Sequence, residues 1–154
     1  MRLPTLSLVI VIACGPGDYT TPPAGPPTGF PHAYAHRTCA PWDGAAVAMY
    51  LTPSPLVSGA QFPPAMAYVE ITIWRGLDHL AGTVWTWPTT EQIGLVARCS
   101  AQSECEQAMT ARVRFRFADS TDRLEGDVEA AFPSGATTKG EFRAVWRSEQ
   151  VFCG

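Results

Sequence analysis

The chain has 154 residues, a formal net charge of −3 at pH 7, 46% hydrophobic residues and 16% charged residues. The slight excess of negative charge argues against nucleic acid or an acidic membrane surface as a partner, because both attract positive charge. The hydrophobic fraction is that of a folded protein and excludes disorder over most of the length. A chain of this size is expected to form one domain with a substantial core.

An apolar run over residues 3–13, preceded by Arg2, comes first along the chain. It falls well short of the roughly 20 apolar residues that a membrane-spanning helix needs. Its length and its positive flank are typical of a secretory signal peptide. The run ends in Val11-Ile12-Ala13-Cys14, which resembles the lipobox of bacterial lipoproteins, and the resemblance covers residues 1–14 alone.

In that family the cysteine thiol receives a diacylglyceryl group, and a peptidase cleaves just before the cysteine. The resemblance therefore implies that residues 1–13 are removed and that a lipid on Cys14 anchors the chain to a membrane. Gly15 in the next position implies the outer membrane of the cell envelope, where the cell has one. The alternative is an ordinary cleaved signal peptide in which Cys14 has no role.

Residues 14–38 are rich in proline and glycine, with Pro22-Pro23 and Pro26-Pro27 as the densest points. Such a composition buries too little apolar surface to offset the entropy lost on ordering. We therefore expect residues 14–38 to be an extended tether that begins with the lipidated cysteine. The folded domain is expected over residues 39–154.

Setting Cys14 aside leaves four cysteines, an even number in a chain expected to enter an oxidising compartment. Cys99 and Cys105 are close in sequence and are predicted to form a local disulfide. Cys39 and Cys153 would then join the start of the domain to its end. A zinc site is the alternative interpretation, and it has less support because no C-x₂-C pair is present.

Beyond residue 39, apolar and polar residues alternate with a period of two, and turn residues recur at short intervals. This pattern predicts an all-β fold of seven or eight strands, either an antiparallel β-sandwich or a partly closed β-barrel. The predicted strands are residues 45–52, 66–74, 80–87, 93–98, 111–117, 124–132 and 138–147.

Charged residues alternate along the strands predicted at 111–117 and 124–132. Pairing Phe117 with Leu124 places three arginines opposite three carboxylates on a solvated face, and Asp127 is also expected to lie between Arg114 and Arg143. Opposite charges across a hairpin contribute roughly 0.2–1 kcal/mol and disfavour a slip of one residue. The expected pairs are Arg116 with Glu125, Arg114 with Asp127 and Arg112 with Glu129.

Motifs that carry chemistry are scarce. His32 and His36 have the spacing that suits a metal on a helix, but the neighbouring prolines argue against a helix there. His79 follows Asp78 in a predicted turn. No nucleophile elbow, phosphate-binding loop or dinucleotide fingerprint is present. We therefore predict no catalytic residue, no metal and no cofactor.

Four aromatic residues are the candidate binding residues. Trp85 and Trp87 lie two apart on one strand face, and Tyr68 and Trp74 share a face of a neighbouring predicted strand. If these faces coincide, the rings form an exposed platform that suits a sugar ring or a protein partner. The alternative is that they form one layer of the core, where large aromatic residues are usually buried.

The favoured function is a non-catalytic module, anchored to the cell envelope by lipid, that binds an unknown protein or small molecule. A lipocalin-like carrier with its ligand inside the barrel is the first alternative. An envelope hydrolase ranks third, and it would need His79 to meet a carboxylate and a nucleophile in one cleft. A passive structural part of a larger envelope assembly is the fourth.

Overall fold

The computed structural model describes residues 24–119, 123–147 and 151–153, and these residues form an almost entirely β structure. The predicted all-β class is confirmed. This described part holds nine strands and one short 3₁₀ helix, η1, so it exceeds the predicted number of strands. The elements are β1 His32–Cys39, β2 Ala45–Thr52, β3 Tyr68–Ile73, η1 Leu77–His79, β4 Val84–Trp87, β5 Gly94–Cys99, β6 Cys105–Gln107, β7 Thr110–Ala118, β8 Leu124–Ala131 and β9 Thr137–Trp146.

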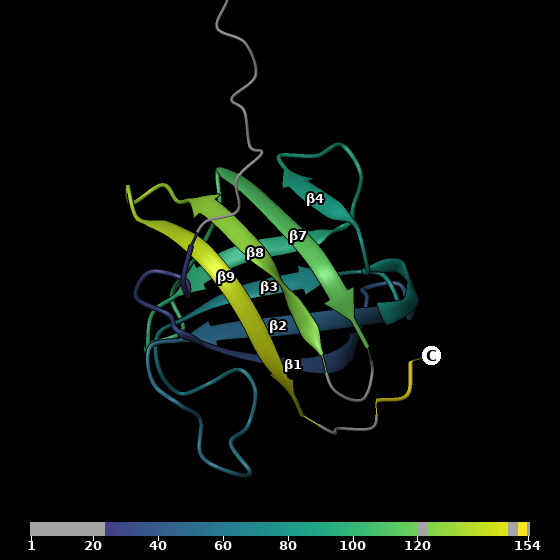
Figure 1. Ribbon diagram of the computed structural model, residues 1–154, viewed down its shortest axis with the longest axis horizontal. Helices are drawn as coiled ribbons and strands as arrows, with labels where there is room; N and C mark the ends of the chain where they lie inside the picture. Colours follow the sequence, from purple (N-terminus) through teal and green to yellow (C-terminus); the bar gives the residue numbers. More distant parts are fainter. Residues whose placement is uncertain (1–23, 120–122, 148–150, 154) are drawn as a thin grey trace, which may run out of the picture.

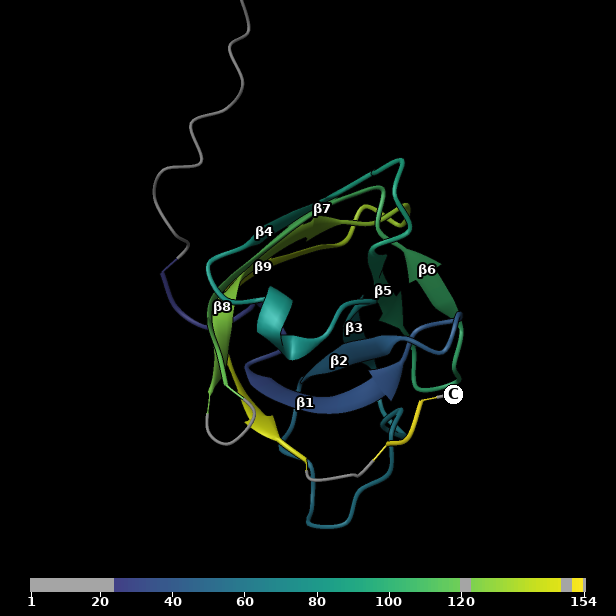
Figure 2. The same ribbon diagram turned by 90° about the vertical axis from the view of Figure 1, so that its right-hand side faces the viewer.

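All nine strands belong to one sheet, in the order β4-β7-β8-β9-β1-β2-β3-β5-β6. The sheet curls on itself into a half-barrel, so that β7, β8 and β9 face β1, β2 and β3 across the core (Figure 1, Figure 2). Neighbouring strands are antiparallel except for β9 and β1, which run parallel. The sheet is therefore mixed, and not purely antiparallel as predicted, because β1 enters it from a segment expected to lie outside the domain.

Residues 32–38 belong to β1, so the tether expected over residues 14–38 is wrong for this part. β1 lies between β9 and β2 in the middle of the sheet. Its small apolar residues alternate, and Ala33 and Ala35 face the core. Residues 1–23, with the expected signal peptide and Cys14, lie outside the described residues.

The segment before β1 also packs on the sheet. The Glu141 N–H donates to the Gly25 carbonyl at 2.7 Å, and the Thr28 N–H donates to the Lys139 carbonyl at 3.2 Å. Gly140 permits this approach, because a Cβ there would lie 2.4 Å from backbone atoms of Pro27. The folded part therefore already includes residues 25–31, which sequence composition assigned to the tether.

The main core fills the interior of the half-barrel. Phe115, Phe132, Met49 and Leu80 are among its largest fully buried side chains. Leu80 directly follows η1, which lies across the end of the half-barrel that faces the viewer in Figure 2. Because Leu80 turns into the core there, the strand predicted over residues 80–87 is shortened to β4.

A second, smaller aromatic cluster lies on the outer face of the sheet, under the proline-rich loop of residues 53–67. Phe62 of this loop stacks on His36 and Tyr50, with ring centroids 4.7 and 5.0 Å apart. Burial, and then the charge of Glu70, raise the pKa of the Tyr50 hydroxyl far above its ordinary value, so the hydroxyl stays neutral. The loop is thus fastened to the sheet by ring packing.

The hairpin of β7 and β8 follows the predicted register for only part of its length. Arg112 is opposite Glu129 and Arg114 is opposite Asp127, as predicted. A β-bulge between Phe115 and Phe117 then shifts the pairing by one residue. The predicted pairs Phe117–Leu124 and Arg116–Glu125 are therefore wrong. Phe117 is opposite Glu125, and Ala118 is opposite Leu124.

The bulge also redistributes the ion pairs. Arg116 binds Glu141 of β9 at 2.9 Å instead of Glu125. Asp127 lies between two arginines of its own hairpin, 2.7 Å from Arg114 and 3.7 Å from Arg112. Arg143 pairs with Glu125 at 3.0 Å, so the expectation that Asp127 lies between Arg114 and Arg143 is wrong for Arg143.

Both predicted disulfides are present. Cys39 at the end of β1 is bonded to Cys153, and Cys99 at the end of β5 is bonded to Cys105 at the start of β6. The first joins residues 114 apart and the second joins residues 6 apart. The Cys99–Cys105 loop leads into β6, which continues almost directly into β7 and links the two halves of the curled sheet.

Candidate functional site

The four predicted aromatic binding residues occupy three different places. Tyr68 is 4% exposed and packs edge-on against Tyr50 in the outer cluster, with ring centroids 5.4 Å apart. Trp74, just beyond β3, makes an edge-to-face contact with Trp42 at 5.4 Å. Trp42 belongs to the turn between β1 and β2 and is half exposed.

Trp85 and Trp87 lie on β4, at the edge of the other half of the sheet, and pack against the main core. The Trp85 indole N–H donates to Thr83 Oγ1 at 2.8 Å, and that of Trp87 donates to the Gly94 carbonyl at 3.3 Å. The structure therefore does not bring the four rings into one exposed platform, because Tyr68 is buried in the outer cluster and Trp85 and Trp87 pack against the main core. The alternative core role fits Trp85 and Trp87.

The predicted histidine pair lies on β1, where His36 is stacked under Phe62. Among the described residues there is no group of three or more His, Cys, Asp or Glu side chains arranged to hold a metal ion. Within the same ranges, no helix is long and apolar enough to cross a membrane.

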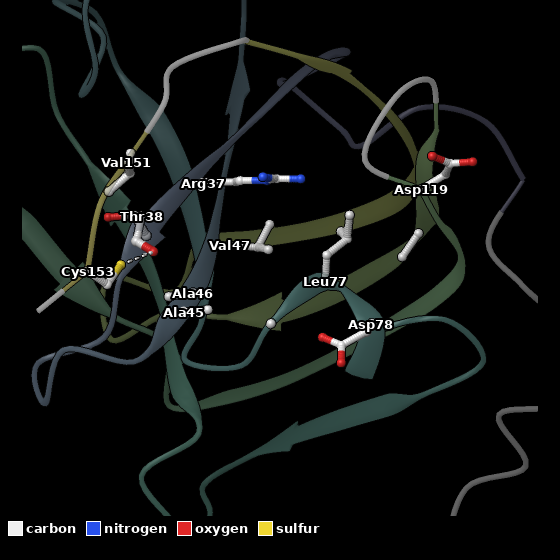
Figure 3. Close-up of a pocket in the computed structure, with 12 residues that line it drawn as sticks. Arg37, Thr38, Ala45, Ala46, Val47, Leu77, Asp78, Asp119, Val151 and Cys153 are labelled. Atoms are coloured by element: carbon white, nitrogen blue, oxygen red, sulfur yellow. Dashed lines mark hydrogen bonds between the residues drawn. The ribbon is translucent and has the colours of Figure 1, made fainter.

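The site that the structure offers instead is a cleft of about 660 Å³ at one end of the half-barrel (Figure 3). We call this end the mouth; it is where β1 and β7 end, β2 begins and η1 lies. Volumes of this order are typical of small-molecule sites. The described residues that line the mouth cleft are Arg37, Thr38, Ala45, Ala46, Val47, Gly76, Leu77, Asp78, Ala118, Asp119, Val151 and Cys153.

Arg37 is the distinctive residue of the mouth cleft. On β1 it follows Ala33 and Ala35 at a spacing of two, so it belongs to the face of the strand that lines the core. Its guanidinium extends over the cleft (Figure 3) and makes no ion pair with any described residue. Its side chain is exposed at this end of β1, so the guanidinium is accessible to a ligand in the cleft.

The bulge in β7 keeps the mouth cleft open. It turns Phe117 outward, where the side chain is 50% exposed and lies under the Arg123 guanidinium, 4.9 Å from the ring centroid. It places Ala118, with its single methyl group, against the cleft in the inward position. Uninterrupted alternation would have put the phenyl ring of Phe117 there. Bulges commonly re-aim side chains in this way beside functional sites.

Two carboxylates complete the rim. Asp78 belongs to η1 and Asp119 follows β7, and Figure 3 shows both across the cleft from the strand that carries Arg37. The Asp78 carboxylate also lies 3.4 Å from the Nε2 of His79. Between these charges the surface is apolar, with Val47 and Leu77 at its centre (Figure 3). The cleft thus combines one cation, two anions and an apolar floor.

Sequence reasoning missed Arg37 because residues 14–38 were assigned to the tether by their composition. The signal that identifies it is the alternation of Ala33, Ala35 and Arg37, which continues one face of a strand up to Cys39. Comparison with protein-family models, curated proteins and solved structures finds no match to this chain.

Proposed function

We propose that this protein is a lipid-anchored binding module of the bacterial cell envelope that holds its ligand in the mouth cleft. The observation that carries the proposal is Arg37, an exposed arginine at the mouth end of a central strand, whose guanidinium extends over a cleft with an apolar floor. Small-molecule sites are typically apolar concavities with a few polar groups placed to orient the ligand.

The cysteines support an extracytoplasmic location. Four of the five are paired in the two disulfides, and such bonds persist in oxidising compartments and are rare in the cytosol. The fifth, Cys14, stands at the end of the sequence that resembles a lipobox. Its proposed role is to carry the anchor.

The topology supports a cleft directed away from the anchor. β1 and β9 run parallel and both end towards the mouth. The chain approaches β1 along residues 139–141, near the beginning of β9. Residues 24–31 therefore enter from the end of the half-barrel opposite the mouth. A ligand outside the membrane is the occupant that this arrangement favours.

The carrier and hydrolase alternatives have less support. A carrier with its ligand inside the barrel needs interior space, and the interior is filled by side chains such as Phe115, Phe132 and Leu80. An envelope hydrolase needs His79 in a cleft with a nucleophile, and His79 does not line the mouth cleft as far as the described residues define it.

The anchor is tested by replacing Cys14 with serine in the full chain, made in an exporting bacterium. We expect the wild-type chain in the membrane fraction with the mass of a lipid-modified protein, and the C14S chain in the soluble fraction. A C14S chain that stays with the membrane, or an unmodified Cys14 in the wild type, would contradict the anchoring part of the proposal.

The cleft is tested by a thermal-shift screen of small charged and zwitterionic compounds against the full chain. We expect hits that raise the melting temperature of the wild type and of an Arg143→Ala control. The same hits should leave Ala118→Phe unchanged because it fills the cleft, and hits that carry an anionic group should act less on Arg37→Ala because it removes the cation. Hits that act equally on all four proteins would place the ligand elsewhere.

A further inference from the structure

We infer that the ligand of the mouth cleft is a short peptide with free termini and an apolar centre, an inference that rests on the proposed function. The reason is the order of charges along the cleft. The β1 wall contributes the guanidinium of Arg37, whereas η1 and the end of β7 contribute the carboxylates of Asp78 and Asp119 (Figure 3).

Ligands with a single charge satisfy only part of this arrangement. A simple carboxylate binds the guanidinium of Arg37 in the charge-assisted way that arginine favours, but it meets repulsion from Asp78 and Asp119. A simple amine is attracted by Asp78 and Asp119, but it meets repulsion from the guanidinium of Arg37. A ligand with a carboxylate at one end and an ammonium group at the other meets favourable charges on both walls.

The apolar floor separates a peptide from other zwitterions. Val47 and Leu77 lie between the charged groups, so the ligand needs an apolar part between its own charges. In an amino acid both charges are attached to one carbon. In a zwitterionic lipid the charges adjoin and the apolar chains lie to one side. A peptide of a few residues has its charges at its two ends and a side chain between them.

The size of the cleft agrees with such a ligand. A volume of about 660 Å³ lies within the range of small-molecule sites, which extends from roughly 300 to 1,000 Å³. It is too small for a folded domain, so the occupant is a short segment. The exposed position of the cleft, away from the proposed anchor, leaves it open to peptides outside the membrane.

Four forms of one tripeptide, Ala-Leu-Ala, test the inference: free, N-acetylated, C-amidated and blocked at both ends. Binding is measured by calorimetry with the full lipid-anchored chain in detergent. We expect the free form to bind at least about tenfold more tightly than either singly blocked form, because each block removes one charge-assisted contact. The doubly blocked form should bind most weakly.

The variants assign each charge to a wall. Arg37→Ala should remove the preference for a free carboxylate and keep the preference for a free amine. The double variant Asp78→Asn/Asp119→Asn should do the reverse. Ala118→Phe should abolish binding of all forms while the melting temperature shows that it is folded. Arg143→Ala, outside the cleft, should bind like the wild type.

The outcomes separate this inference from the proposed function. Equal binding of the free and blocked peptides would overturn the assignment of the termini. If no peptide binds, but isovalerate or isoamylamine binds the wild type and not Ala118→Phe, the peptide class is wrong and the cleft remains a ligand site. If none of these probes binds, the assignment of a peptide ligand is overturned, and the thermal-shift screen decides the cleft itself.

Discussion

At the scale of single residues, Asp127 is the charge that organises the outer face of β7 and β8. It is 4% exposed and accepts a 2.7 Å hydrogen bond from the Nε of Arg114, with Arg112 at 3.7 Å. A buried carboxylate is stable only when it is paired, because its desolvation is costly. Removing the charge leaves the guanidinium groups of Arg112 and Arg114 side by side on one strand face without the carboxylate between them.

We expect Asp127→Asn to lower the free energy of unfolding by about 1–3 kcal/mol, since it removes a nearly buried charge-assisted pair. The matched change Glu129→Gln, at an exposed ion pair with Lys139, should cost less than about 1 kcal/mol. Urea unfolding measures both. A double-mutant cycle of Asp127→Asn with Arg114→Gln should give a coupling energy above about 0.5 kcal/mol, and additive losses would show that the two side chains act independently.

At the scale of elements, the bulge in β7 decides which aromatic side chain belongs to the core. Phe115 is 1% exposed and packs edge-on against Phe142, whereas Phe117 is 50% exposed. By the alternation of residues alone, Phe115 and Phe117 would both face the core. Their different surroundings give a direct test of the bulge, because the same chemical change at each should have different effects.

We expect Phe115→Ala to destabilise the protein by about 3–5 kcal/mol, because it leaves a cavity in the core. Phe117→Ala should cost about 1 kcal/mol or less, which is the loss of partial burial and of the Arg123 contact. Thermal or urea unfolding distinguishes them. Comparable losses at the two positions would mean that the β7 alternation continues without the bulge.

Glu106 of β6 connects elements from both halves of the sheet. Its carboxylate accepts hydrogen bonds from the Ser134 hydroxyl at 2.7 Å and the Ser134 N–H at 3.0 Å, and it pairs with Arg98 of β5 at 3.3 Å. The bonds from Ser134, and then Arg98, hold the pKa of Glu106 below its ordinary value of 4.5. Folding therefore favours the ionised form of this carboxylate.

A lowered pKa in the folded state adds stability above the unfolded-state pKa, and this stability is lost as the pH falls through the folded-state value. We therefore expect wild-type stability to fall as the pH decreases below about 4.5, with a shallower fall in Glu106→Gln. Melting temperatures measured from about pH 3 to about pH 7 test this expectation. Glu104→Gln on the neighbouring loop is the control. Identical pH profiles for Glu106→Gln and the wild type would rule out the linkage.

At the scale of the whole molecule, the two disulfides close loops of very different length. Cys39–Cys153 joins residues 114 apart and fixes the described C-terminal residues beside the mouth cleft, whereas Cys99–Cys105 spans 6 positions. In the chain-entropy account, the gain in stability grows with the logarithm of loop length. The long bridge is therefore expected to matter more.

We expect Cys39→Ser/Cys153→Ser to lower the free energy of unfolding by up to about 5 kcal/mol and Cys99→Ser/Cys105→Ser by up to about 2 kcal/mol. Urea unfolding of each double variant under oxidising conditions measures the difference. The larger loss in the variant without the short bridge would contradict the entropic account for this protein.

Several features followed from the sequence because they depend on local patterns or on elimination. Alternation identified most strands, and it paired Arg114 with Asp127 before the bulge. Four cysteines with one close pair were enough to predict both disulfides. These properties follow from the period of the β-strand and from the short chain between Cys99 and Cys105, so they need no knowledge of distant contacts.

The tertiary structure alone decided the rest. Residues 32–39 have a tether-like neighbourhood in sequence, and they become a central strand only because β2 and β9 supply partners from 45–52 and 144–146. The same long-range pairing, together with the bulge of β7, brings Arg37 and Ala118 to one cleft. Such contacts depend on how distant strands stack and curl, and the local alternation of residues does not encode that geometry.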